Sequence, residues 1–84
     1  MTMPLYFFDV RDKQGLHRDD TGLEFDTLDD AIAEGRRALG DMSREALDTG
    51  GDGDLEITIR DHTEGPVKLA LSLTTELPPD DKLS

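Results

Sequence analysis

The segment that decides the fold is Thr27–Gly50, which reads TLDDAIAEGRRALGDMSREALDTG. Its apolar residues recur every three to four positions, which is typical of an amphipathic helix. The Thr27 hydroxyl can cap the first turn, where Asp29 and Asp30 suit the positive end of the helix dipole. Glycines at 50 and 51 can end the helix. We therefore predict a helix from about residue 28 to residue 49.

One face of this helix is apolar. At 100° per residue the apolar positions fall within an arc of about 120°. The residues in the arc are Leu28, Ala31, Ile32, Gly35, Ala38, Leu39, Met42 and Ala46. Gly35 lies near the middle of the arc, where the lack of a side chain would let a sheet approach closely. The pattern therefore predicts that the helix packs against a sheet.

The residues before the helix predict a hairpin. Pro4–Val10 (PLYFFDV) is rich in aromatic residues, which favours a strand with Tyr6 and Phe8 on one face. Arg11–Gly15 carries Asp and Gly at positions suited to a tight turn. Leu16–Asp20 is expected to return as a second strand, and its polarity suggests the edge of a sheet.

The residues after the helix predict a second hairpin. Leu55–Arg60 alternates apolar and polar side chains, and Val67–Thr74 is the longest alternating run in the chain. Asp61–Gly65 is the expected turn between them. The predicted inner face of the sheet comprises Tyr6, Phe8, Val10, Leu16, Leu55, Ile57, Ile59, Val67, Leu69, Leu71 and Leu73.

These elements give an α+β fold in the order β-β-α-β-β. A four-stranded antiparallel sheet with one helix packed on one face would bury both apolar surfaces. The length allows one small domain, which we place at residues 1–76. From residue 77 the paired prolines and the charged residues predict a disordered C-terminal tail.

Several short stretches resemble a known family. The opening Tyr6–Asp12 (YFFDVRD), the acidic-Thr-Gly-Leu-Glu stretch and the Leu-Asp-Asp-Ala helix start are similar to those of short bacterial proteins that form a domain-of-unknown-function family. The resemblance covers about Met3–Thr75. It implies a stand-alone module in the cytoplasm, and it carries no activity and no functional residues. A weaker likeness, in Thr27–Ala31, is to compact antitoxin-type domains that neutralise toxic ribonucleases.

The charge excludes several partners. Twenty acidic and nine basic residues give a net charge of −11. Nucleic-acid binding needs basic groups to neutralise phosphates, and anionic membranes repel an acidic surface. Arg36, Arg37 and Arg44 alternate with acidic residues, which is typical of a solvated helix face. We expect no nucleic-acid or membrane partner. The sequence shows no secretory leader and no membrane span.

The chemistry-bearing residues do not form a recognisable reactive set. The chain has no cysteine, and Ser43 and Ser72 lie in no nucleophile motif. His17 and His62 lack further ligands at metal-binding spacing. Asp48–Ile59 resembles a calcium loop only in part, because position twelve is Ile instead of Glu. We therefore predict no catalytic, cofactor or metal site, and a protein that is not an enzyme.

Two surfaces are candidates for association. Leu5, Phe7 and Ala70 would form a small apolar patch on the sheet face away from the helix, unless the tail or the segment around Leu23–Phe25 covers Phe7. A helix of ~33 Å would overhang strands of ~23 Å and leave part of its apolar face uncovered. The helix residues expected to be uncovered are Met42, Ala46 and Leu47. Exposed apolar patches often mark partner surfaces.

The leading hypothesis is therefore a protein-interaction module without enzymatic activity. Self-association as a homodimer, through the open sheet face or an edge strand, is one form of it. The alternative is an acidic regulator that sequesters a basic partner such as a toxin or a nuclease. The two differ in their response to salt, because exposed charge pairs are screened.

Overall fold

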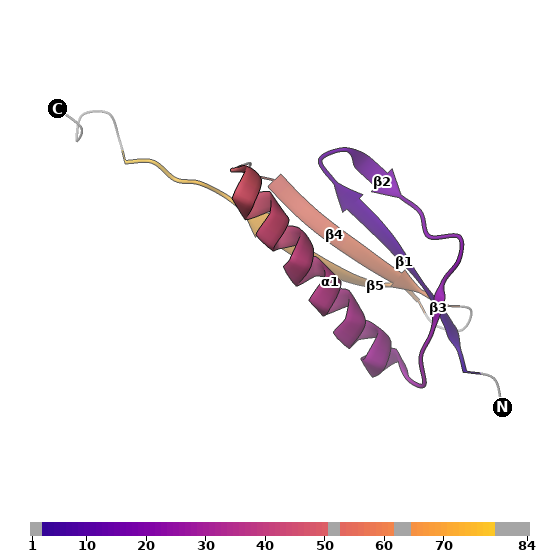
Figure 1. Cartoon of the computed structure of the whole chain (residues 1–84). Coiled ribbons are helices and arrows are strands. Elements are labelled where there is room, and N and C mark those ends of the chain that lie inside the picture. Colours follow the sequence, from indigo (N-terminus) through magenta and orange to yellow (C-terminus); the bar gives the residue numbers. More distant parts are fainter. Residues whose placement is uncertain (1–2, 51–52, 62–64, 79–84) are drawn as a thin grey trace.

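The protein folds as one helix packed on an antiparallel sheet, which confirms the α+β class (Figure 1). The computed structural model describes residues 3–50, 53–61 and 65–78. In chain order the elements are β1 Leu5–Asp12, β2 Gly15–His17, β3 Leu23–Glu24, α1 Leu28–Thr49, β4 Gly53–Arg60 and β5 Val67–Leu73.

The sheet has the strand order β2-β1-β4-β5, with every pair antiparallel. A fifth strand, β3, pairs with the start of β1, while β2 pairs with its end. The sheet therefore has one strand more than the four expected. This additional strand, Leu23–Glu24, is too short to show a periodic pattern in the sequence. The second strand also ends earlier than expected, at His17 instead of Asp20. Its chain leaves the ladder because the Asp19 side chain binds β1 in place of a backbone partner.

The helix ends where the sequence predicts. The Thr27 Oγ1 atom accepts a hydrogen bond from the Asp30 backbone N–H at 3.1 Å. At the other end Gly50 adopts a φ of 77°, and its N–H donates to the carbonyl oxygens of Ala46 and Leu47. A left-handed conformation of this kind favours glycine, which explains the stop.

The core lies between α1 and strands β4 and β5. Ile57 and Ile59 are each 1% exposed and face the buried helix residues Ala31 and Leu39. A Cβ atom built on Gly35 would lie 2.9 Å from Leu69 Cδ1 and 3.1 Å from Ile59 Cδ1. The close approach predicted at Gly35 is therefore confirmed.

The inner face of β1 is covered mainly by an aromatic side chain. The Phe25 ring centroid lies 6.2 Å from that of Tyr6 and 6.0 Å from that of Phe8. Leu16, which we expected on this face, points the other way and is 51% exposed. The hairpin register sets Leu16 opposite Arg11, and directly opposed residues share a face. Arg11 is on the outer face because it is one residue from the inward Val10.

The second hairpin turn and the C-terminus are described only in part. Residues 62–64, which include His62, and residues 79–84 of the predicted tail lie outside the described residues. Thr74–Pro78 forms no helix or strand, leads away from the sheet in Figure 1, and leaves Leu77 82% exposed. Within the described residues, no helix is long and apolar enough to cross a membrane.

Candidate functional site

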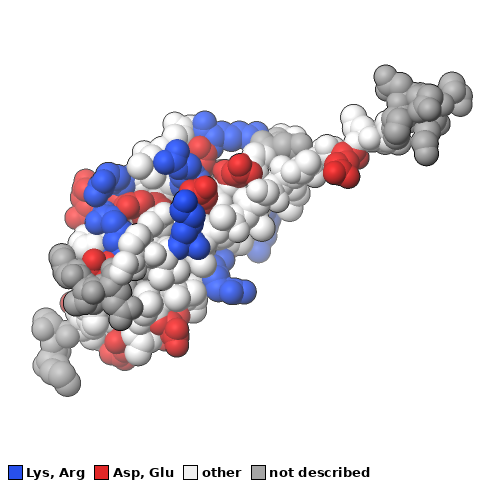
Figure 2. Space-filling view, turned by 180° about the vertical axis from the view of Figure 1, so that it is seen from behind, with Lys and Arg blue, Asp and Glu red and all other residues white. Residues whose placement is uncertain are grey.

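The outer face of the sheet, turned away from α1, is charged. Figure 2 shows basic and acidic side chains side by side on this view from behind. Glu56 of β4 lies 3.9 Å from Arg11 Nε of β1 and 3.7 Å from Lys68 Nζ of β5. Such exposed cross-strand pairs contribute little stability individually, but they make this face polar.

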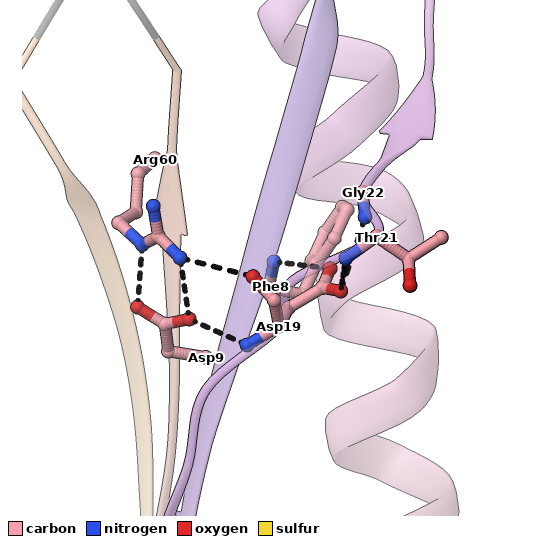
Figure 3. A network of polar contacts seen from close by, with 6 residues as sticks. All are labelled: Phe8, Asp9, Asp19, Thr21, Gly22 and Arg60. Atoms are coloured by element: carbon pink, nitrogen blue, oxygen red, sulfur yellow. Dashed lines mark hydrogen bonds and ion pairs between the residues drawn. The ribbon is translucent and has the colours of Figure 1, made fainter.

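A polar network joins β1, β4 and the segment after β2 on this face (Figure 3). Arg60 Nε donates to Asp9 Oδ2 at 2.6 Å, and Arg60 Nη2 donates to Asp9 Oδ1 at 3.1 Å. This two-pronged geometry is the strong form of an Arg–carboxylate pair. The guanidinium carbon also lies 4.9 Å from the Phe7 ring centroid, so Arg60 covers that ring.

Asp19 completes this network, and its side chain binds the β1 backbone where a neighbouring strand would otherwise pair. Its Oδ2 atom accepts from the Phe8 backbone N–H at 3.0 Å, and its Oδ1 atom accepts from Thr21 and Gly22 N–H groups at 3.0 Å each. The Asp19 N–H donates to Asp9 Oδ1 at 3.0 Å, and the Asp19 carbonyl accepts from Arg60 Nη2 at 3.1 Å. We call Asp9, Asp19 and Arg60 the outer-face network.

The network holds its carboxylates ionised. Hydrogen bonding to Arg60 lowers the pKa of Asp9, against the opposing effect of burial. Burial raises the pKa of Asp19, but backbone N–H donation from Phe8, Gly22 and Thr21 outweighs it, so the pKa lies below its usual value. A general acid or base works best with a pKa near the working pH. The network therefore fits a structural role better than proton transfer.

The structure separates the predicted outer-face patch into two parts. Leu5 and Phe7 are half-buried and lie together against Gly22, where an added Cβ would come 3.0 Å from each side chain. Phe7 is thus covered by Arg60 and by the residue just before β3. Ala70 is exposed on the same face but lies opposite Glu56 in the ladder, four residues along β4 from Arg60, which pairs with Phe7.

The predicted helix residues lie together at an open groove. This groove, of about 420 Å³, lies between the C-terminal half of α1, the β1–β2 turn and the adjoining ends of β4 and β5. Its apolar lining comprises Met42, Ala46, Leu47, Leu55, Leu71 and Leu73. Met42 is half-buried, whereas Leu47 is 60% and Leu71 42% exposed. We call these six residues the edge groove.

The edge groove borders an edge of the sheet. In the described residues β5 pairs with β4 alone, so its second edge is not covered by another strand. Sequence reasoning missed Leu71 as an exposed residue, because alternation assigns it to the inner face. The sequence does contain a signal for this exposure, because the predicted helix is longer than the predicted strands. A difference in length leaves side chains of the helix and of the sheet partly uncovered at the same end.

The histidines and carboxylates do not assemble a metal centre in the part of the chain that the structure describes. His17 is exposed, and its Nε2 atom lies 3.4 Å from Asp12 Oδ1. A single carboxylate neighbour fits a surface pair at the end of the first hairpin.

Comparison with known proteins identifies the family. Residues 5–74 match the sequence model of a domain of unknown function, DUF6894, so the chain belongs to that family. The match confirms the resemblance to a domain-of-unknown-function family seen in the sequence. No curated protein matches the chain. No solved structure matches it either.

Proposed function

We propose that this member of the DUF6894 family is a non-enzymatic protein-interaction module that pairs an extended strand of a partner with the β5 edge. The observation that supports this most is that, among the residues the structure describes, Val67–Leu73 pairs with β4 alone and lies beside an apolar groove. A free edge presents backbone N–H and C=O groups that an added strand can pair with. Strand addition then takes its affinity from the backbone and its selectivity from neighbouring side-chain pockets.

β5 carries few of the features that keep edge strands from pairing. Proteins protect edges with proline, bulges or several charged residues. The segment Val67–Leu73 contains no proline, and its one charged residue, Lys68, already pairs with Glu56. The opposite edge of the sheet is formed by β2 and β3, which are only three and two residues long. Strand addition is therefore better accommodated at β5.

The edge groove supplies the side-chain pocket that this mode of binding needs. Side chains of an added strand would alternate between the two faces of the sheet. Those on the helix side would meet Leu71 and Leu73 and the C-terminal half of α1, which carries the half-buried Met42 and the exposed Leu47. Those on the other side would meet the polar outer face.

Leu71→Lys tests this proposal, with Leu16→Lys as the matched control. Both leucines are exposed, at 42% and 51%, and both variants add the same charge. Only Leu71 lies at the edge groove. We expect Leu71→Lys to weaken association with any protein partner, a second copy included, at least about tenfold, because it introduces a charge into the interface. Leu16→Lys should bind as the unaltered protein does.

Association would be measured by sedimentation of the pure protein and by titration with each purified protein that the unaltered chain captures. Circular dichroism checks that both variants keep the fold. Association that survives Leu71→Lys unchanged, or its absence in the unaltered protein, would overturn the proposal.

The alternative, an acidic regulator, draws on a second hollow of about 450 Å³ at the start of α1. Glu24, Asp26 and Asp30 line it, and its one basic residue, Arg37, already binds Glu34. A basic partner held there should bind more weakly as salt rises, and Asp26→Asn with Asp30→Asn should weaken it further. Binding that is indifferent to salt and to both changes would exclude this function.

A further inference from the structure

We propose that the strand bound at the β5 edge is β5 of a second copy, in antiparallel register with Ala70 opposite the partner's Ala70. This inference rests on the proposed use of the β5 edge. It names the occupant and the register. It predicts a two-fold symmetric dimer in which the two sheets join into one, since a two-fold interface brings the same patch together from both subunits.

Charge favours this edge for contact between two acidic chains. From Gly65 to Thr75 the sequence contains no Asp or Glu, the longest such interval in a chain with twenty acidic residues and a net charge of −11. β5 lies entirely inside that interval. Two copies that meet along β5 therefore bring together the strands with the least negative charge, where repulsion between them is smallest.

The side chains of β5 suit pairing about its midpoint. Ala70 is the central residue of Val67–Leu73, so an Ala70-centred register pairs the full length of both strands. It sets Lys68 opposite the partner's Ser72, and no like charges face one another. A register centred on Lys68 would bring two lysines into direct opposition, which is unfavourable.

The same register covers the β5 residues of the edge groove. Leu71 would lie opposite the partner's Leu69, and Leu73 opposite the partner's Val67. Antiparallel pairing in one continuous sheet puts both helices on the same side. These leucine and valine side chains would then meet across the seam between the two helices, which removes the 42% exposed Leu71 from water.

Single-cysteine variants test the register directly, because the native chain has no cysteine. Residues directly opposed in an antiparallel pair have Cα atoms about 4.5–5.5 Å apart, within disulfide range. Ala70→Cys should therefore form a disulfide-linked dimer. Ser72→Cys is the matched control, because it is exposed on the same face but would lie about 14 Å from its own copy.

We expect Ala70→Cys to cross-link at least about tenfold faster than Ser72→Cys at equal concentration. Sedimentation of the unaltered protein should show a dimer that becomes tighter between about 0.05 and about 0.5 M NaCl, because salt screens the repulsion between acidic chains. Equal rates for the two cysteines, or a protein that stays monomeric at both salt concentrations, would overturn the dimer. If Leu71→Lys still abolished binding of another protein, the proposed function would stand without it.

Discussion

At the scale of single residues, Asp19 accounts for the most unexpected part of the structure. Its carboxylate accepts three backbone N–H groups, from Phe8, Thr21 and Gly22, and so ties an irregular segment to β1. The sequence gives no periodic signal for such a contact. Nor does it pair Asp9 with Arg60, which lie 51 positions apart in the chain. Sequence patterns find neighbours on one element, whereas this network depends on the tertiary register.

Replacing Asp19 with Ala should destabilise the fold by about 1–3 kcal/mol, because the three backbone donors lose their acceptor. Asp20→Ala is the matched control, since it removes the same charge from an exposed neighbour. Urea denaturation followed by circular dichroism measures both free energies of unfolding. An equal loss in the two variants would show that the Asp19 hydrogen bonds contribute nothing beyond charge.

The network should also make stability depend on pH in a stated direction. The pKa values of Asp9 and Asp19 are lower in the folded state than the ordinary value of 3.8. The unfolded chain therefore binds protons first as the pH falls, and the stabilisation present above about pH 4 is lost as pH drops through the folded pKa values.

When the pH is lowered from 6 into the acid range, the free energy of unfolding should fall in both proteins. We expect the fall to be smaller in Asp19→Asn than in the unaltered protein. Comparing the two chains removes the contribution of the remaining acidic residues. Parallel pH profiles for the two proteins would contradict the assignment of the lowered pKa to Asp19.

At the scale of elements, the helix was the most predictable part. Its length follows from the Thr27 cap, the apolar period and Gly50, all of which are local signals. The strands were less predictable at their ends. The prediction that Leu16 lies on the inner face of the sheet was wrong. The β1–β2 turn pairs Asp12 with Gly15, and this register determines which face Leu16 occupies, whatever its hydrophobicity.

The two mid-helix glycines should respond oppositely to alanine. Among the described residues, no atom beyond the adjacent residues and the nearby helix backbone lies within 4 Å of a Cβ built on Gly40, so Gly40→Ala should stabilise the fold by about 0.5–1 kcal/mol through helix propensity. The same change at Gly35 meets Leu69 and the buried Ile59, so overpacking should exceed that gain and destabilise the protein. Thermal unfolding measures both, and stabilisation by Gly35→Ala would show that the helix can move away from the sheet.

At the scale of the whole molecule, charge and topology favour the same edge of the sheet as the site of the proposed association. The sequence predicted a partly uncovered end of α1 at Met42 and Leu47, since the lengths of a helix and of strands can be compared without coordinates. It could not show that Leu71 opens at the same end, nor that β5 forms an edge, because strand order is a tertiary property. The structure unites these features with the acid-free interval of the sequence. The polar outer face, in contrast, divides Ala70 from Leu5 and Phe7.

Amide hydrogen exchange of β5 tests most directly whether its free edge is paired in solution. Exchange would be followed in the unaltered protein at low and high concentration, and in Leu71→Lys. We expect amides within Val67–Leu73 to exchange more slowly at high concentration, with no such change in Gly15–His17 or in the variant. β5 amides whose exchange depends neither on concentration nor on Leu71 would contradict pairing between copies along this edge.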